Sequence, residues 1–231
     1  MGALLAFGAG VVDVCTYLGL FGLFVAQLTG SFVMIGAQVV KYDPYWPLHT
    51  IALPIFFVAG FGTAFLAAFA GRLRPALCCT LGVEFVLVGG FVAAGVIGWP
   101  FAQPNAPLAV TTGVLGIAAM GVQSGLVRLL LKGHPSTNVM TTNTSELALN
   151  VAHWAGAAWR ATRHPDDADA VAVRQAARAH VALLWPVFAG FIVGVVCGAV
   201  VFNVIGFWCA LISLATIGGV LIWAVRFVPR T

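Results

Sequence analysis

Two short polar motifs interrupt a chain that is otherwise strongly apolar. The first is Thr29-Gly30-Ser31, preceded by Gln27, and the second is Thr142-Asn143-Thr144 in the other half of the sequence. Hydroxyl and amide side chains of this kind cap helices, because they accept hydrogen bonds from unpaired backbone N–H groups. They can equally bind a polar solute or an anion. The apolar run from the first motif to Val40 is too short to cross a bilayer as a helix.

Two carboxyl groups lie inside long apolar runs. Asp13 lies within the first run, and Glu84 lies near the middle of the third. A charged carboxylate at the centre of a bilayer costs about 3 kcal/mol on insertion scales, so such residues usually face a cavity or a partner. Either group could bind and release a proton, or could hold two helices together through hydrogen bonds, and both alternatives stay open. Asp13 aligns with Gln123 of the fourth run.

These polar residues form the predicted site. The predicted substrate-binding residues are Gln27, Thr29, Gly30, Ser31, Gln123, Thr142, Asn143 and Thr144. Asp13 and Glu84 are the predicted proton-coupling residues. Helix capping alone is the competing explanation for both motifs. Arg128 is expected to extend its side chain to the cytoplasmic interface, and attraction of an anion there is the less favoured interpretation.

The composition assigns the chain to a membrane. Hydrophobic residues make up 61% of it and charged residues only 8%, whereas soluble domains carry about 25% charged residues. A spanning helix needs roughly 20 apolar residues, and six stretches meet that requirement. They are residues 2–24, 50–71, 76–98, 107–131, 181–201 and 204–227. The fold class predicted is an all-α polytopic protein, with residues 1–231 as a single membrane domain.

The order of motifs predicts two related halves, residues 1–100 and 105–231. Each half would hold three spans and one polar motif, and an odd number of spans gives the halves opposite orientations. The prediction is therefore an inverted three-plus-three repeat with two re-entrant half-helices, the first entering from outside and the second from inside. Backbone that is not helical is tolerated at that depth only where protein or a water-filled cavity satisfies it.

The cationic residues set the predicted orientation. With both termini in the cytoplasm, all of the eleven Lys and Arg residues except Lys41 fall on the cytoplasmic side. The segment near 160–180 then becomes a cytoplasmic connector, and Pro165-Asp166-Asp167 suits the start of a helix that leads into the fifth span. Because the cations lie at the ends of apolar runs and form no stripe, a nucleic-acid partner is not expected.

Enzymatic chemistry finds no support in the motifs. The five cysteines lie inside apolar runs without metal-ligand spacing. Serine-hydrolase, zinc-protease and phosphate-loop signatures are missing from the sequence. We therefore expect no enzyme activity, no cofactor and no bound metal. The expected partners are the lipid bilayer and a small solute or anion, and the glycine-rich helix faces permit a homodimer.

One pattern carries a family resemblance. The sequence Gly10-x-x-Asp13, a Leu/Phe-rich stretch, and then Phe24-Val25-x-x-x-Thr29-Gly30-Ser31 resembles the YoaK family of bacterial membrane proteins. Gly121-x-Gln123 and the later Thr-rich segment are similar to it too. This chain has Ser31 where the family usually has Asn, and Thr142-Asn143-Thr144 where a Thr-Gly-Thr pattern is commoner. The resemblance implies a location in a bacterial inner membrane and implies no particular activity.

The residues favour one function over one alternative. The favoured function is an inner-membrane transporter or channel for a small polar solute or anion, with or without proton coupling, whose site lies between the two motifs. The alternative is a scaffold or sensor that does not transport and that acts through its cytoplasmic loop.

Overall fold

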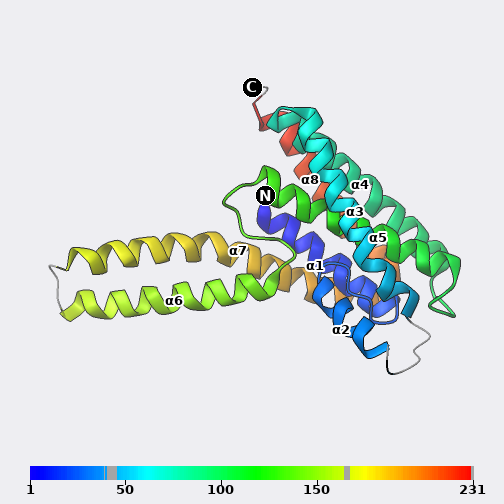
Figure 1. The fold of residues 1–231 in the computed structure, drawn as a ribbon, viewed down its shortest axis with the longest axis horizontal. Coiled ribbons are helices and arrows are strands. Elements are labelled where there is room, and N and C mark those ends of the chain that lie inside the picture. Colours follow the sequence, from blue (N-terminus) through cyan, green and yellow to red (C-terminus); the bar gives the residue numbers. More distant parts are fainter. Residues whose placement is uncertain (39, 41–45, 164–166, 230–231) are drawn as a thin grey trace.

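The computed structural model describes residues 1–38, 40, 46–163 and 167–229, and within them the chain is almost entirely helical. The predictions for Lys41, Pro165, Asp166 and Arg230 lie outside the described residues. The elements, labelled in Figure 1, are α1 (Gly2–Gly19), α2 (Leu28–Gln38), α3 (Trp46–Ala70), α4 (Leu73–Gly98), α5 (Pro107–Leu130), α6 (Met140–Arg163), α7 (Ala168–Ile205), the 3-10 helix η1 (Gly206–Ala210) and α8 (Leu211–Phe227).

Five stretches of the described chain are long and apolar enough to cross a membrane. They are Gly2–Gly19, Leu48–Ala70, Leu73–Gly98, Pro107–Leu130 and Ala168–Phe227. The last stretch contains both the fifth and the sixth predicted spans, because η1 joins α7 to α8 without an intervening polar loop. The all-α, multi-span character of the chain is therefore confirmed, and the count of six spans stays a prediction.

The first span ends earlier than hydropathy indicates. The predicted run reached residue 24, but α1 ends at Gly19. Beyond it the backbone turns through positive φ angles at Phe21 (56°) and Gly22 (81°). Hydropathy does not register this turn, because the residues that form it are as apolar as those of the helix.

The segment after the second motif differs more from its prediction, which was a re-entrant half-helix. The helix that begins there, α6, runs on to Arg163 and packs along α7. Together they form a hairpin that projects from the bundle in Figure 1. Asp167 caps α7 by accepting a hydrogen bond from the Ala170 N–H at 3.0 Å. The predicted connector helix is thus present, and it is continuous with the predicted fifth span.

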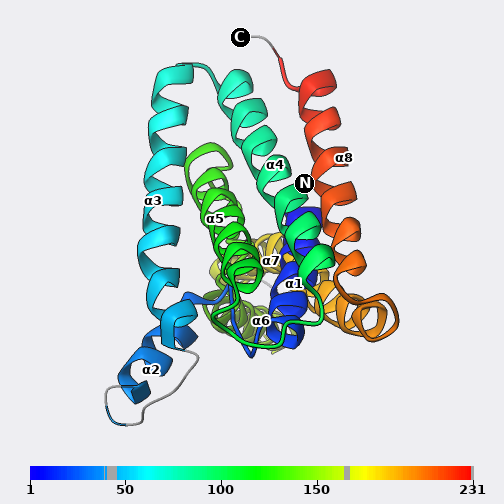
Figure 2. The same ribbon diagram turned by 90° about the vertical axis from the view of Figure 1, so that its right-hand side faces the viewer.

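The helices of the two halves pack in matching pairs. Helix α1 of the first half packs on α7 of the second, and α5 of the second half packs on α3 of the first. The contact between α1 and α8 matches the contact between α5 and α4. In the same way, the contact between α2 and α3 matches the contact between α6 and α7. Figure 2 shows α3, α4, α5 and α8 standing beside one another, with α1 and α7 behind. The contacts between helices thus follow the same pattern in both halves.

Glycines allow both of the central pairs to approach closely. A Cβ on Gly190 of α7 would lie 2.5 Å from the Ala3 carbonyl oxygen of α1. On α5, a Cβ on Gly121 would lie 2.8 Å from the Ala59 Cβ, and one on Gly125 would lie 2.9 Å from the Thr63 Cβ. Helices in lipid have no hydrophobic driving force for association. Small residues at such crossings allow close van der Waals packing, which drives the association instead.

Candidate functional site

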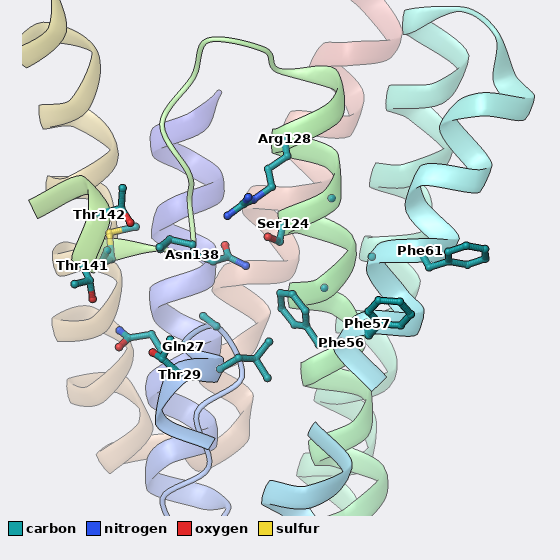
Figure 3. Close-up of a pocket in the computed structure, with 17 residues that line it drawn as sticks. Gln27, Thr29, Phe56, Phe57, Phe61, Ser124, Arg128, Asn138, Thr141 and Thr142 are labelled. Carbon is teal, nitrogen blue, oxygen red and sulfur yellow. The ribbon is translucent and has the colours of Figure 1, made fainter. Parts of the chain in front are cut away.

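A pocket of about 830 Å³ lies where α2 and α6 begin, beside α3 and α5. Its polar lining residues come from both motif segments and from α5. They are Gln27, Thr29, Ser124, Arg128, Asn138, Thr141 and Thr142. Figure 3 shows them around the space between the two helix starts. The structure therefore places one cavity between the two polar motifs.

Both helix N-termini open on this pocket. Leu28 and Thr29 begin α2, and Met140, Thr141 and Thr142 begin α6. The first N–H groups of a helix have no intrahelical partner and carry partial positive charge. The hydroxyl groups of the three threonines make no hydrogen bond within the described part of the chain. The pocket thus offers donors from backbone and side chains at two places.

Asp13 anchors the segment that leads into α2. Its Oδ1 accepts hydrogen bonds from the backbone N–H groups of Val25 and Ala26, both at 2.8 Å. The residue is buried and does not line the main pocket. It lines a neighbouring cavity of about 340 Å³, which shares Gln27 with the main pocket. This carboxyl therefore positions the first motif.

Gln123 anchors the segment that leads into α6. Its Nε2 donates to the Leu5 carbonyl at 3.0 Å and to the Thr137 Oγ1 at 2.9 Å. Asn138 adds a hydrogen bond from its Nδ2 to the Met120 carbonyl at 3.0 Å. Val25 and Thr137 both precede the next helix by three residues. The alignment of Asp13 with Gln123 thus has a structural counterpart.

The helix starts correct the register between the motifs by one residue. The sequence comparison paired Thr29 with Thr142, whereas the starts at Leu28 and Met140 pair Thr29 with Thr141. This register also pairs Ser31 with Asn143, and those two side chains are 1% and 2% exposed. The two residues thus share the same burial at the same distance from the start of their helices.

Glu84 on α4 is completely buried, and neither of its carboxyl oxygens has a hydrogen-bond partner among the described residues. A Cβ on Gly90 would lie 3.3 Å from Leu115, and one on Gly116 would lie 3.3 Å from Phe91. This antiparallel register places Glu84 at the level of Gln123 on α5, whose Oε1 is also unpaired within that part of the chain. Glu84 lines none of the cavities described above.

The structure thus brings together part of the predicted site. Gln27, Thr29 and Thr142 line the pocket, whereas Gly30, Ser31, Gln123, Asn143 and Thr144 do not. Ser124, Arg128, Asn138 and Thr141 also line the pocket, although they are not among the predicted substrate-binding residues. Gly121, Ser124, Gly125 and Arg128 follow helical spacing, so the face of α5 that meets the pocket was readable from the sequence.

Comparison with known proteins gives one match. A family model described as "Protein of unknown function (DUF1275)" matches residues 1–223. No curated protein and no solved structure matches the chain. The match covers both polar motifs and brings no activity with it.

Proposed function

Because the chain belongs to the DUF1275 family, the same family as the YoaK proteins that its motifs resemble, and because that family's description assigns no activity, we propose a function from the geometry. The protein is a transporter or channel for a small polar solute or anion. The pocket between the starts of α2 and α6 is its binding site.

One observation carries this proposal: two helices of an apolar bundle begin at a single cavity. Interrupted helices whose N-termini point at a shared site are typical of secondary transporters, where they bind the polar part of the substrate. Capping alone would satisfy the N–H groups of each helix with its own side chains. Here the hydroxyls of Thr29, Thr141 and Thr142 face a cavity instead.

The matching helix pairs support an inverted repeat around this site. In this proposal α1, α3 and α4 correspond to α5, α7 and α8, while α2 and α6 are the two helices that enter from opposite sides. The arginine distribution supports cytoplasmic termini in a bacterial inner membrane. Arg74 at the start of α4 donates a hydrogen bond to the Val225 carbonyl near the end of α8, so these two basic helix ends lie together.

Flux measurements on protein in liposomes test the site. Thr29→Val and Thr142→Val should each lower the flux of a transported solute about tenfold at subsaturating concentration, which corresponds to the loss of about one hydrogen bond. Thr111→Val is the matched control, because Thr111 lies on α5 away from the pocket and bonds to the Pro107 carbonyl. Equal flux in all three variants, at equal amounts of folded protein, would contradict the proposed site.

Proton coupling is proposed for Glu84. A buried carboxyl without partners is costly to ionise, so a proton would leave it only in a conformation that supplies water or a partner. Glu84→Gln should abolish the response of flux to a pH gradient while preserving flux down a solute gradient. A gradient response like that of the wild type would remove Glu84 from the mechanism. Coupling at Asp13 stays a prediction, which the same measurement on Asp13→Asn tests.

The α6–α7 hairpin supports the second candidate function, a scaffold or sensor. It exposes apolar side chains away from the bundle, including Trp154, Trp159 and Val173. The Arg163 guanidinium stacks on the Trp159 ring at 4.3 Å. Under this alternative, liposomes would show no flux for any anion or polar solute, and Trp154→Ser would abolish the co-purification of a partner.

A further inference from the structure

A positive charge faces the main pocket without a counter-charge. Arg128 on α5 is the one charged side chain among the described residues that line it. It forms neither an ion pair nor a hydrogen bond with any residue of the described ranges. Glu146 of α6 lines an adjacent cavity of about 340 Å³ together with Arg128 and still makes no ion pair with it. The Arg128 side chain is exposed and lies in the last turn of α5, so its guanidinium is accessible to a ligand.

The groups around Arg128 are donors. Figure 3 shows the Arg128 side chain directed toward the segment that contains Asn138, with Ser124 one turn away on the same helix. Thr141 and Thr142 add free hydroxyls, and the N-terminus of α6 adds partial positive charge. Guanidinium and hydroxyl donors around an open space match the oxygens of a carboxylate or a similar anionic group.

The remainder of the pocket wall is apolar. Leu28, Phe56, Val139 and Met140 line it, together with glycines at 60, 121 and 125. A volume of about 830 Å³ falls in the range of sites for small organic molecules, roughly 300–1,000 Å³. An inorganic ion would leave most of this wall without a contact, whereas the hydrocarbon part of an organic anion would cover it.

We propose, on the basis of the transport function above, that the pocket binds an organic anion with one charged head and an apolar body. The head lies on Arg128 and the hydroxyls at the start of α6, and the body lies against Phe56 and its apolar neighbours. A free organic acid and an anionic phospholipid both have this chemistry, and the experiment separates them.

The test uses the full chain in nanodiscs of phosphatidylcholine, with benzoate as the probe and benzamide as its neutral counterpart. Benzoate should bind and raise the unfolding midpoint, and benzamide should bind at least about tenfold more weakly. Arg128→Gln should weaken benzoate binding at least about tenfold, as expected for the loss of a charged hydrogen bond. Arg174→Gln, which removes an exposed arginine of α7, should bind as the wild type does.

A second measurement uses the wild-type protein, so that it does not depend on how the variant folds. Benzoate should protect Arg128, but not Arg174, from modification by phenylglyoxal, read by peptide mass spectrometry. If phosphatidylglycerol has no Arg128-dependent effect, equal binding of benzoate and benzamide, or an Arg128 that benzoate leaves unprotected, would overturn the proposal. An Arg128-dependent shift that appears only when phosphatidylglycerol is added would identify the lipid, and not a free organic acid, as the anion that the pocket binds.

Failure of this inference can be told apart from failure of the transport function. Arg128-dependent binding of benzoate without flux of any solute would remove the transport function and leave the anion site. Flux of a neutral polar solute that is equal in Arg128→Gln and wild type, without benzoate binding, would remove the anion site and leave the transport function.

Discussion

Replacing Gly194 by alanine is expected to destabilise the folded bundle strongly. Gly194 of α7 lies against the backbone of α1, and a Cβ there would overlap the Phe7 carbonyl oxygen. Backbone atoms cannot rotate away as a side chain can, so the two helices would have to separate. Separation would also weaken the contact at Gly190, one turn earlier, where a Cβ would lie 2.5 Å from the Ala3 carbonyl oxygen. We expect a loss of at least about 3 kcal/mol, the upper part of the range for overpacked cores.

Thermal unfolding in nanodiscs checks this result, with Gly219→Ala as the matched control. Gly219 lies on α8, and a Cβ there would meet no atom within 4 Å. Alanine is favoured over glycine in helices by about 1 kcal/mol, so the control should unfold at or above the wild-type temperature. If Gly194→Ala unfolds at the same temperature as Gly219→Ala, the close α1–α7 crossing is wrong.

Hydropathy predicted the positions of the membrane helices well where a helix ends at a polar or proline-rich turn. The third predicted span, 76–98, corresponds to α4, and the fourth, 107–131, corresponds to α5. Hydropathy failed at the end of α1, because the turn that Asp13 holds is apolar and cannot be distinguished from a continuation of the helix. It also missed the length of α6, since that helix is too polar to show in hydropathy and packs along its neighbour α7.

The sequence predicted where the site lies better than it predicted which residues line it. The two motifs mark the cavity because chain breaks in an apolar bundle need a place where polar backbone is satisfied. Which side chains face that cavity depends on helix register and on neighbouring helices. Thr144, one position beyond Asn143, is directed to the Met140 carbonyl, whereas Thr141 faces the pocket. Arg128 also lines the pocket, and its proximity to α6 cannot be read from one sequence.

Asp13→Ala is expected to destabilise the protein strongly and to displace the first motif. The Val25 and Ala26 N–H groups both lose their acceptor, and each buried N–H left unpaired costs about 1–3 kcal/mol. The sum is about 2–6 kcal/mol, and a membrane-buried turn has little water to replace the carboxyl oxygen. Gln27 and Leu28 follow this turn directly, so the pocket wall should lose its geometry along with the turn.

Asp13→Asn separates the anchoring role from a charge effect. The amide keeps one oxygen in the place of Oδ1, so it can accept the same two hydrogen bonds without the negative charge. We expect Asp13→Asn to retain most of the stability that Asp13→Ala loses, measured by thermal unfolding in nanodiscs at one pH. Equal unfolding temperatures for Asp13→Ala and wild type would show that the turn does not depend on this carboxyl. If the unfolding temperature of Asp13→Asn falls as far as that of Asp13→Ala, the charge itself is required. The acceptor oxygen alone would then be insufficient to hold the segment that leads into α2.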